Sequence, residues 1–221
     1  TQGVSSAASD VYKRQLQDEV LTAVREQDPE RIVFIPAMGW QDYNYIKYAR
    51  VAGEDSNAVV SFHYYLPMLL SHYKMLAWVG YQGAVQYPGV VIPTQSDADK
   101  YPQYASFHKT TYNADRIMGE MSNAASDGRN AGLAVHCGEF GCSKNVAEAM
   151  RLAWFTDMVA AMEANNIPWT LWECLDGGFG FVDMEYGIYR INCPLLKVLT
   201  GKELTDAEAK ALLQKYGFKT E

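Results

Sequence analysis

Four short apolar stretches, each preceded by a stretch with helical periodicity, constrain the fold of this chain most strongly. The apolar stretches span residues 31–36, 58–63, 132–136 and 167–172, and they are rich in the β-branched residues typical of buried strands. Strands that are separated by helices run parallel and are joined by right-handed crossovers. The sequence therefore predicts an α/β fold with four buried parallel strands.

The helical stretches have apolar residues three and four positions apart. Asn145 and Glu148 have the spacing of a capping box and predict the start of the fourth helix, as Thr205 and Glu208 do for the last helix. Residues 66–109 form a long connection rich in Tyr, Pro and Gly, and connections of that length are usually functional. The expected helices are 16–27, 43–51, 112–125, 146–164, 194–199 and 206–216.

Polar and aromatic side chains follow the carboxyl ends of all four expected strands, which is where (β/α)8 barrels build their active sites. They are Trp40, His63, Tyr65, Glu139 and Trp172. A doubly wound sheet would instead favour a glycine-rich turn after an early strand, and the sequence has none. Because a complete barrel has eight strands in ~250 residues, the four strands predict the C-terminal half of a (β/α)8 TIM barrel.

Charge and composition exclude several classes of function. Acidic residues outnumber basic residues by 26 to 19 without a basic cluster, which disfavours a nucleic-acid partner. No apolar run approaches the ~18 residues of a membrane span. Cysteines are too few for a disulfide scaffold, and Cys137 and Cys142 are expected as buried free thiols, with a short bridge between them as the alternative.

The first fifteen residues are expected to lie outside the folded domain. Ser9 to Gln15 resembles the in-frame translation of a transposase adapter end used in sequencing, so residues 1–15 are interpreted as a non-native or disordered leader. An ordinary flexible N-terminal tail is the alternative. The remaining residues, 16–221, form the predicted partial barrel.

Glu139 is the strongest candidate for a reacting group. It lies just past an apolar strand between Gly138 and Gly141, where glycines let the backbone approach a ligand. A carboxylate there is a candidate nucleophile or acid/base, and a structural glutamate bound by backbone amides is the alternative.

Three further side chains at the same rim are candidates for sugar contacts. His63 and Tyr65 can donate hydrogen bonds to a sugar hydroxyl or to a neighbouring carboxylate, although a buried core histidine is the alternative for His63. Trp172 offers a flat face on which a pyranose ring can stack, unless it packs inside the barrel as Trp169 is expected to do.

A metal site is not favoured. His136, Cys137 and Cys142 are ligand types, but neighbouring residues of a strand point to opposite faces and no second pair completes a tetrahedral site. The glycines at 177–180 lack the Lys-Ser/Thr of a phosphate-binding loop, and a Gly-x-Ser-x-Gly motif is absent from the sequence.

The motifs occur in an order that resembles the C-terminal half of glycoside hydrolase family 5, whose members are retaining (β/α)8 cellulases and related β-glycanases. The resemblance spans residues 16–201. It implies that Glu139 is the nucleophile, that Tyr65 orients it, and that His63, Trp172, His72, Trp78 and Trp40 bind substrate. The matching motifs are His63-x-Tyr65-x-Pro67, Ser71-His72, Ala77-Trp78, Gly138-Glu139-Phe140-Gly141, and Trp172-Glu173 leading into Gly178-Phe179-Gly180.

One expected motif does not occur. The retaining mechanism needs a second carboxyl group ~5 Å from the nucleophile, and in this family it is supplied by an Asn-Glu-Pro motif that the sequence lacks. The chain is therefore interpreted as truncated and inactive alone, with its acid/base glutamate missing. Glu173 and Asp176 are the nearest substitutes by position, and Asp183 is a further carboxylate to consider.

The resemblance implies hydrolysis of β-linked glucan by double displacement, without a metal or an organic cofactor. It also implies a β-glucan oligosaccharide or polysaccharide as the partner, a monomer when full length, and an extracellular or periplasmic location. The alternatives are a non-catalytic carbohydrate-binding protein and a hydrolase of mannan or xylan.

Overall fold

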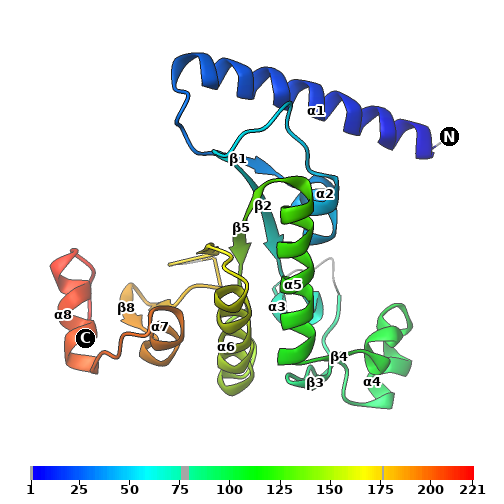
Figure 1. Cartoon of the computed structure of the whole chain (residues 1–221). Coiled ribbons are helices and arrows are strands. Elements are labelled where there is room, and N and C mark those ends of the chain that lie inside the picture. Colours follow the sequence, from blue (N-terminus) through cyan, green and yellow to red (C-terminus); the bar gives the residue numbers. More distant parts are fainter. Residues whose placement is uncertain (1, 76–79, 176) are drawn as a thin grey trace.

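Four parallel strands form the central sheet of the protein (Figure 1). The computed structural model describes residues 2–75, 80–175 and 177–221, with side chains from residue 12 onward. The strands lie in the order in which they occur in the sequence, and each pairs in parallel with its neighbour. They are β1 (Val33–Pro36), β2 (Ala58–Tyr64), β5 (Ala134–Phe140) and β6 (Trp169–Leu171). The predicted four-stranded parallel sheet is confirmed.

The two faces of the sheet differ in burial. Helices α5 (Ala114–Ala131) and α6 (Glu148–Ala164) lie side by side against one face. The residues of β2 that face them, such as Phe62 and Tyr64, are buried, whereas the alternate residue His63 is half-buried. Helices therefore cover one of the two faces of the sheet.

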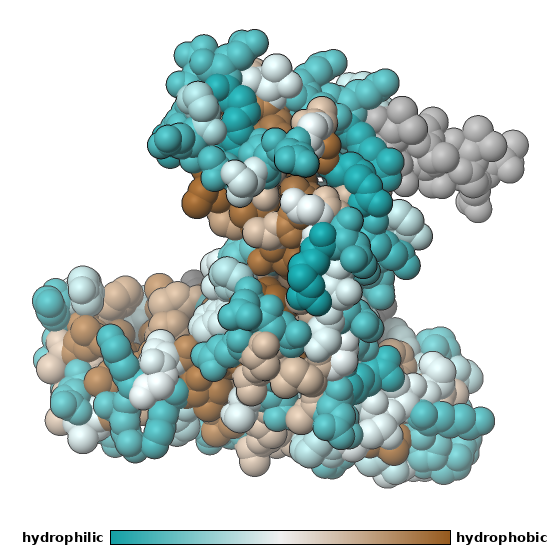
Figure 2. Space-filling model, viewed as in Figure 1, coloured by the Kyte–Doolittle hydropathy of each residue, from teal (hydrophilic) through white to brown (hydrophobic). Residues whose placement is uncertain are grey.

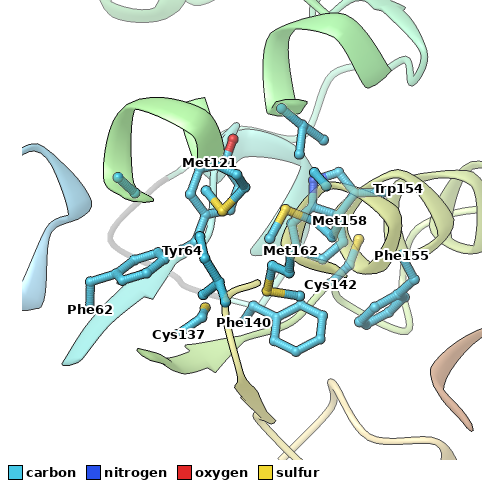
Figure 3. Close-up of a cluster of buried hydrophobic side chains, with 14 of the residues drawn as sticks. Phe62, Tyr64, Met121, Cys137, Phe140, Cys142, Trp154, Phe155, Met158 and Met162 are labelled. Carbon is cyan, nitrogen blue, oxygen red and sulfur yellow. The ribbon is translucent and has the colours of Figure 1, made fainter. Parts of the chain in front are cut away.

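The core lies between this face and the two helices (Figure 3). Trp154 of α6 is completely buried, and its ring lies 6.5 Å from that of Tyr64 and 6.3 Å from that of Phe140. Its indole Nε1 donates a 3.0 Å hydrogen bond to the carbonyl of Leu66. Trp154 therefore joins α6 to β2, to β5 and to the connection that follows β2.

The first helix is longer than expected. α1 (Gln2–Gln27) runs without a break through the segment set apart in the sequence, and it extends away from the sheet at the top of Figure 1. The helix predicted at residues 16–27 is its second half. The domain boundary at residue 15 stays a prediction.

Two local expectations differ from the structure. Residues 43–51 do not form an α-helix: η1 (Tyr43–Tyr48) is a 3-10 helix that follows the short α2 (Met38–Gln41). The capping box predicted at Asn145 is also absent, because α6 begins after Ala147 and Asn145 instead donates from Nδ2 to the carbonyl of Tyr73, 3.2 Å away. The capping box of Thr205 and Glu208 is confirmed.

The long connection after β2 is built from short elements, and a small unit follows β6. The connection lies beside the ends of α5 and α6 in Figure 1. The connection contains α3 (Met68–Ser71), β3 (Gly89–Val90), α4 (Gln95–Lys100), η2 (Pro102–Lys109) and β4 (Thr111–Tyr112). The final unit contains β7 (Val182–Glu185), β8 (Ile188–Ile191), α7 (Cys193–Thr200) and α8 (Asp206–Lys215).

Among the described helices, none is long and apolar enough to cross a membrane.

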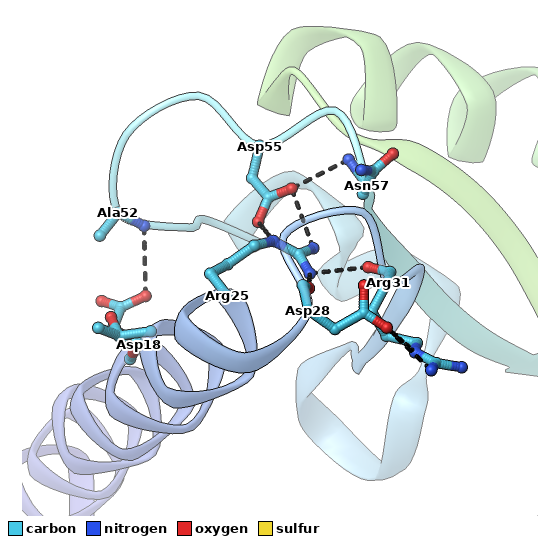
Figure 4. A network of polar contacts seen from close by, with 8 residues as sticks. Asp18, Arg25, Asp28, Arg31, Ala52, Asp55 and Asn57 are labelled. Carbon is cyan, nitrogen blue, oxygen red and sulfur yellow. Dashed lines mark hydrogen bonds and ion pairs between the residues drawn. The ribbon is translucent and has the colours of Figure 1, made fainter.

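A polar network fastens the end of α1 to the connection between β1 and β2 (Figure 4). Arg25 donates two hydrogen bonds to the carboxylate of Asp55, from Nε at 2.8 Å and from a terminal nitrogen at 3.1 Å. It also donates to the carbonyl of Arg31, at 2.7 Å. Together with Gln17, which donates to the carbonyl of Arg50 at 2.9 Å, Arg25 attaches α1 beside the sheet.

Candidate active site at the carboxyl end of the sheet

A bulge in β5 brings Glu139 into register with His63. Phe62 pairs with Cys137, but the next residue of β2, His63, pairs with Glu139, so Gly138 is the additional residue. A Cβ on Gly138 would lie 2.4 Å from Oγ of Ser61, so glycine is the residue that fits here without a shift of Ser61. Bulges of this kind re-aim side chains beside active sites. The sequence predicted that Glu139 and His63 are neighbours, and the structure shows how they meet.

The Glu139 carboxylate is held by two side chains of the preceding strand end. The hydroxyl of Tyr65 donates a 2.9 Å hydrogen bond to Oε2, and Nδ1 of His63 lies 3.4 Å from the same oxygen. Neither of these contacts uses Oε1. The side chain of Glu139 is 28% exposed, so a ligand can reach it.

Burial shifts the pKa values of Tyr65 and His63, the two side chains that hold Glu139. It raises the pKa of Tyr65, and the hydrogen bond to Glu139 raises it further, so the phenol remains a proton donor. Burial lowers the pKa of His63, although the nearby carboxylate of Glu139 opposes this effect. A neutral His63 can donate from Nδ1 to Oε2.

Two rings support Tyr65. The ring of His72 lies 4.9 Å from the Tyr65 ring, the ring of Phe179 lies 5.8 Å from it, and the two supporting rings are 5.2 Å apart. Ser71 is buried, and its Oγ donates to the carbonyl of Tyr65 and lies 2.9 Å from Nδ1 of His72. His72 is thus part of the packing around Tyr65, and its predicted contact with substrate stays a prediction.

The tryptophans differ in their surroundings. Trp172 follows β6, its backbone N–H donates to Phe140, and 45% of the residue is exposed, so its ring is accessible at the rim. Trp40 follows β1 and is 99% exposed. Trp169 packs edge-on against Phe140 at 5.2 Å, as expected for a packing residue. Trp78 lies outside the described residues.

The backbone around Trp40 has an unusual conformation. Gly39 has φ +60°, and a Cβ there would lie 2.7 Å from the ring of Tyr45. Trp40 and Gln41 also have positive φ, of 63° and 62°. Glycine at position 39 therefore allows the chain to pass Tyr45 and leave Trp40 in solvent.

The candidates for the second carboxylate differ in their surroundings. Asp183 is paired with Nζ of Lys144 at 3.0 Å. Glu173 has one buried carboxylate oxygen, Oε1, with no hydrogen-bond partner among the described residues, and it packs against Gly177. Asp176 lies outside the described residues.

The possible metal ligands point apart. Nε2 of His136 lies 3.1 Å from Thr170 Oγ1, on the face of the sheet away from the helices, whereas Cys137 is completely buried on the other face. Cys137 and Cys142 are free thiols. Within residues 2–75, 80–175 and 177–221, no group of three His, Cys, Asp or Glu side chains could hold a metal ion.

Two residues that shape the site received no role from the sequence. Ser61 lies against the bulge at Gly138, and Phe179 supports Tyr65. Ser61 gives no signal in the sequence because its role depends on pairing with a distant strand. Phe179 does give one, since a large aromatic residue between two glycines indicates a ring fixed in a closely packed loop.

A parallel sheet that presents a carboxylate, a histidine and exposed tryptophans at its carboxyl end has the arrangement of a (β/α)8 glycosidase. The sequence matches the family Cellulase (glycosyl hydrolase family 5) over residues 7–178. The chain belongs to this family.

Curated relatives agree with this assignment. Endoglucanase C of Acetivibrio thermocellus is 23% identical over 179 residues, which are 77% of this chain and 49% of that protein. Endoglucanase H of the same organism is 25% identical over 174 residues, which are 79% of this chain and 16% of that protein. The chain therefore spans about half the length of the first of these relatives, and less of the second.

Solved structures show the same fold. A hyperthermophilic endo-beta-1,4-glucanase in complex with substrate superposes with a TM-score of 0.66 at 22% identity, covering 87% of this chain and 55% of that one. Cel5A of Thermotoga maritima in complex with mannotriose gives 0.63 at 19% identity, with coverages of 86% and 55%. The four βα units thus have the fold of part of a (β/α)8 barrel.

Proposed function

We propose that this chain supplies the nucleophile and part of the substrate-binding surface of a retaining β-glucanase. The observation that supports this most directly is the Glu139 carboxylate, held through Oε2 by Tyr65 and His63. Oε1 is then the oxygen available to attack an anomeric carbon. The endoglucanases among the relatives support a β-glucan as substrate.

In the first step, Oε1 of Glu139 bonds to the anomeric carbon as the bond to the leaving oxygen breaks. The leaving oxygen needs a proton from a general acid. In the second step, water replaces Glu139 at the anomeric carbon while a general base takes a proton from that water. Tyr65 and His63 donate to Oε2 and keep the carboxylate oriented throughout.

We propose that the general acid/base is not among the residues of this chain. Asp183 is neutralised by Lys144, and the sequence contains no Asn-Glu-Pro motif. On this proposal the chain hydrolyses unactivated glucan poorly by itself, because loss of a general acid costs on the order of 10²–10⁴-fold in rate.

An aryl cellobioside with an activated leaving group tests both proposals in the chain as it stands. Its phenolate leaves without a proton, so one equivalent is released in a burst, and turnover is then slow because no base activates water. Azide attacks without a base and is expected to accelerate turnover and give a β-glycosyl azide. A chain that hydrolyses unactivated glucan at an ordinary rate would contradict the missing acid/base.

Glu139→Gln is expected to abolish the burst, because an amide does not attack the anomeric carbon. Glu163→Gln, at an exposed position of α6, is the matched control and keeps the burst. If Glu139→Gln keeps the burst, Glu139 is not the nucleophile. A chain that binds cello-oligosaccharides but never releases phenolate would instead be a carbohydrate-binding protein.

We also propose Trp172 as a stacking surface for a sugar ring, with Trp40 as a second surface farther along the rim. Trp172→Ala is expected to weaken binding of a cello-oligosaccharide by on the order of 1–3 kcal/mol, as for other rings stacked on aromatic side chains. Calorimetric titration measures this, with circular dichroism as the control for folding. Titration with manno-oligosaccharides in parallel distinguishes glucan from mannan, the sugar class bound to one structural neighbour.

A further inference from the structure

A buried arginine behind the candidate site has no role in the mechanism above. Arg151 lies on α6 and is 4% exposed. It donates from Nε to the carbonyl of Cys142 at 2.9 Å, and from one terminal nitrogen to the carbonyls of Phe179 at 2.5 Å and Gly180 at 2.8 Å. No carboxylate of the described residues lies within ion-pair distance of it.

A buried cation without a paired anion is costly, and burial accordingly lowers the pKa of Arg151. The planar guanidinium can, however, donate hydrogen bonds to several carbonyl groups at once. These carbonyls belong to two segments, the one that follows β5 and the one that follows β6. Hydrogen bonds from Arg151 therefore join both segments to α6.

The segment held after β6 contains Phe179, whose ring lies 5.8 Å from that of Tyr65. Tyr65 in turn donates its hydroxyl to Oε2 of Glu139. A continuous path thus runs from the guanidinium through the backbone and ring of Phe179 to the phenol that orients the carboxylate. Among the described residues, Arg151 makes no hydrogen bond or ion pair with Glu139, His63 or Tyr65.

We propose that Arg151 is a positioning residue: by holding the Phe179 carbonyl, it sets the Phe179 ring against Tyr65 and so maintains the hydrogen bond between Tyr65 and Glu139. This assignment rests on the proposed function only for its consequence in catalysis. The geometry itself can be tested without turnover.

The test follows the phenol carbon of Tyr65 by NMR in protein labelled with ¹³Cζ-tyrosine. Its resonance is assigned by its loss in Tyr65→Phe. Arg151→Lys keeps the charge but cannot hold all three carbonyls, so the Tyr65 resonance is expected to move toward the position of a tyrosine in water. Resonances of tyrosines distant from Phe179 stay in place.

A second variant tests the path without touching the arginine. Phe179→Leu is expected to move the Tyr65 resonance in the same direction, and adding Arg151→Lys to it is expected to move it little further, because both act through one ring. Arg116→Lys is the matched control. Arg116 also lies on a helix that packs on the sheet, but it contacts Glu120 and Tyr112 instead.

An unmoved Tyr65 resonance in Arg151→Lys or in Phe179→Leu would overturn the proposal, as would additive effects in the double variant. A general shift of all tyrosine resonances would overturn it too, since that indicates a purely structural arginine. If these results are as expected but the wild-type chain shows no burst with the aryl cellobioside, the proposed function fails and the positioning role stands.

Discussion

At the scale of single residues, the position of Glu139 depends on Gly138 having no side chain. Gly138→Ala would place a Cβ 2.4 Å from Oγ of Ser61, whereas the next nearest atom is 3.7 Å away. We expect this variant to lose about 1–3 kcal/mol in the free energy of unfolding, as overpacked sites do. Adding Ser61→Ala removes the clashing oxygen and should restore most of the loss.

Urea unfolding of the two single variants and the double variant measures this coupling. Ser61→Ala alone is the control, because this substitution by itself removes the 3.4 Å contact between Ser61 and His136. Equal losses for Gly138→Ala with and without Ser61 would show that the bulge does not depend on this contact.

Histidine burial predicts a pH dependence of stability. Burial lowers the pKa values of His63 and His72 from 6.5 in the folded chain, so the unfolded chain binds more protons just below pH 6.5. The contribution of these histidines to the free energy of unfolding should therefore be fully present above that pH and should be lost as the pH falls. Urea unfolding at about pH 7.5 and about pH 5.5 measures the loss. His72→Gln should reduce it, and an unchanged loss would exclude His72 as a contributor.

At the scale of elements, Arg25 makes the bidentate ion pair that attaches the end of α1 to the connection between β1 and β2. Asp55→Asn weakens a bidentate pair whose side chains are only 20% and 13% exposed, and we expect a loss of about 1–2 kcal/mol. The pKa of Asp55 is lowered chiefly by this hydrogen bond, so the contribution is lost as the pH falls below 3.8.

Hydrogen exchange of residues 12–27 tests the attachment of α1, and it should become faster in Asp55→Asn. Asp28→Asn is the control, since the Arg31–Asp28 pair is 67% and 41% exposed and such pairs contribute ~0–1 kcal/mol. Similar exchange in both variants would show that α1 is held by other contacts.

The elements show why some features could be predicted from sequence. β-branched runs between helical stretches predicted all four strands, and the ends of consecutive parallel strands predicted that His63 and Glu139 meet. The bulge at Gly138 depends on the partner strand, so local periodicity does not contain it. Residues 43–51 have helical periodicity, but in the structure they form only a 3-10 helix, Tyr43–Tyr48, after the left-handed residues at 39–41.

Arg151 was missed for a different reason. Arginine in a helix is usually a surface residue, yet this one has the spacing of the apolar face, three, four and seven positions before Trp154, Phe155 and Met158. A charged residue in register with an apolar face was therefore a signal present in the sequence. The hairpin of β7 and β8, by contrast, was not predicted.

At the scale of the whole molecule, one face of the sheet remains uncovered. Ile32 and Phe34 are 60% and 54% exposed, and hydrophobic side chains gather over the sheet in Figure 2, between α1 and the two long helices. Within the described chain, β1 and β6 each pair on one side only. Open edges beside apolar surface favour association.

We therefore predict that the chain self-associates at micromolar concentration, and that Phe34→Lys reduces this association. Sedimentation velocity at several concentrations measures it. Lys210→Ala, at an exposed position of α8, is the control for a change of charge far from the sheet. Association that is unchanged by Phe34→Lys would place the contact elsewhere.

The proposed attack of Glu139 on the sugar can be tested by covalent labelling. A 2-deoxy-2-fluoro-β-cellobioside with an activated leaving group forms a glycosyl ester that hydrolyses slowly, so mass spectrometry of the digested protein locates it. We predict one label per chain, on the peptide that contains Glu139, and none in Glu139→Gln. A label on Glu173 or Asp183, or the absence of any label on the wild-type chain, would show that Glu139 is not the nucleophile.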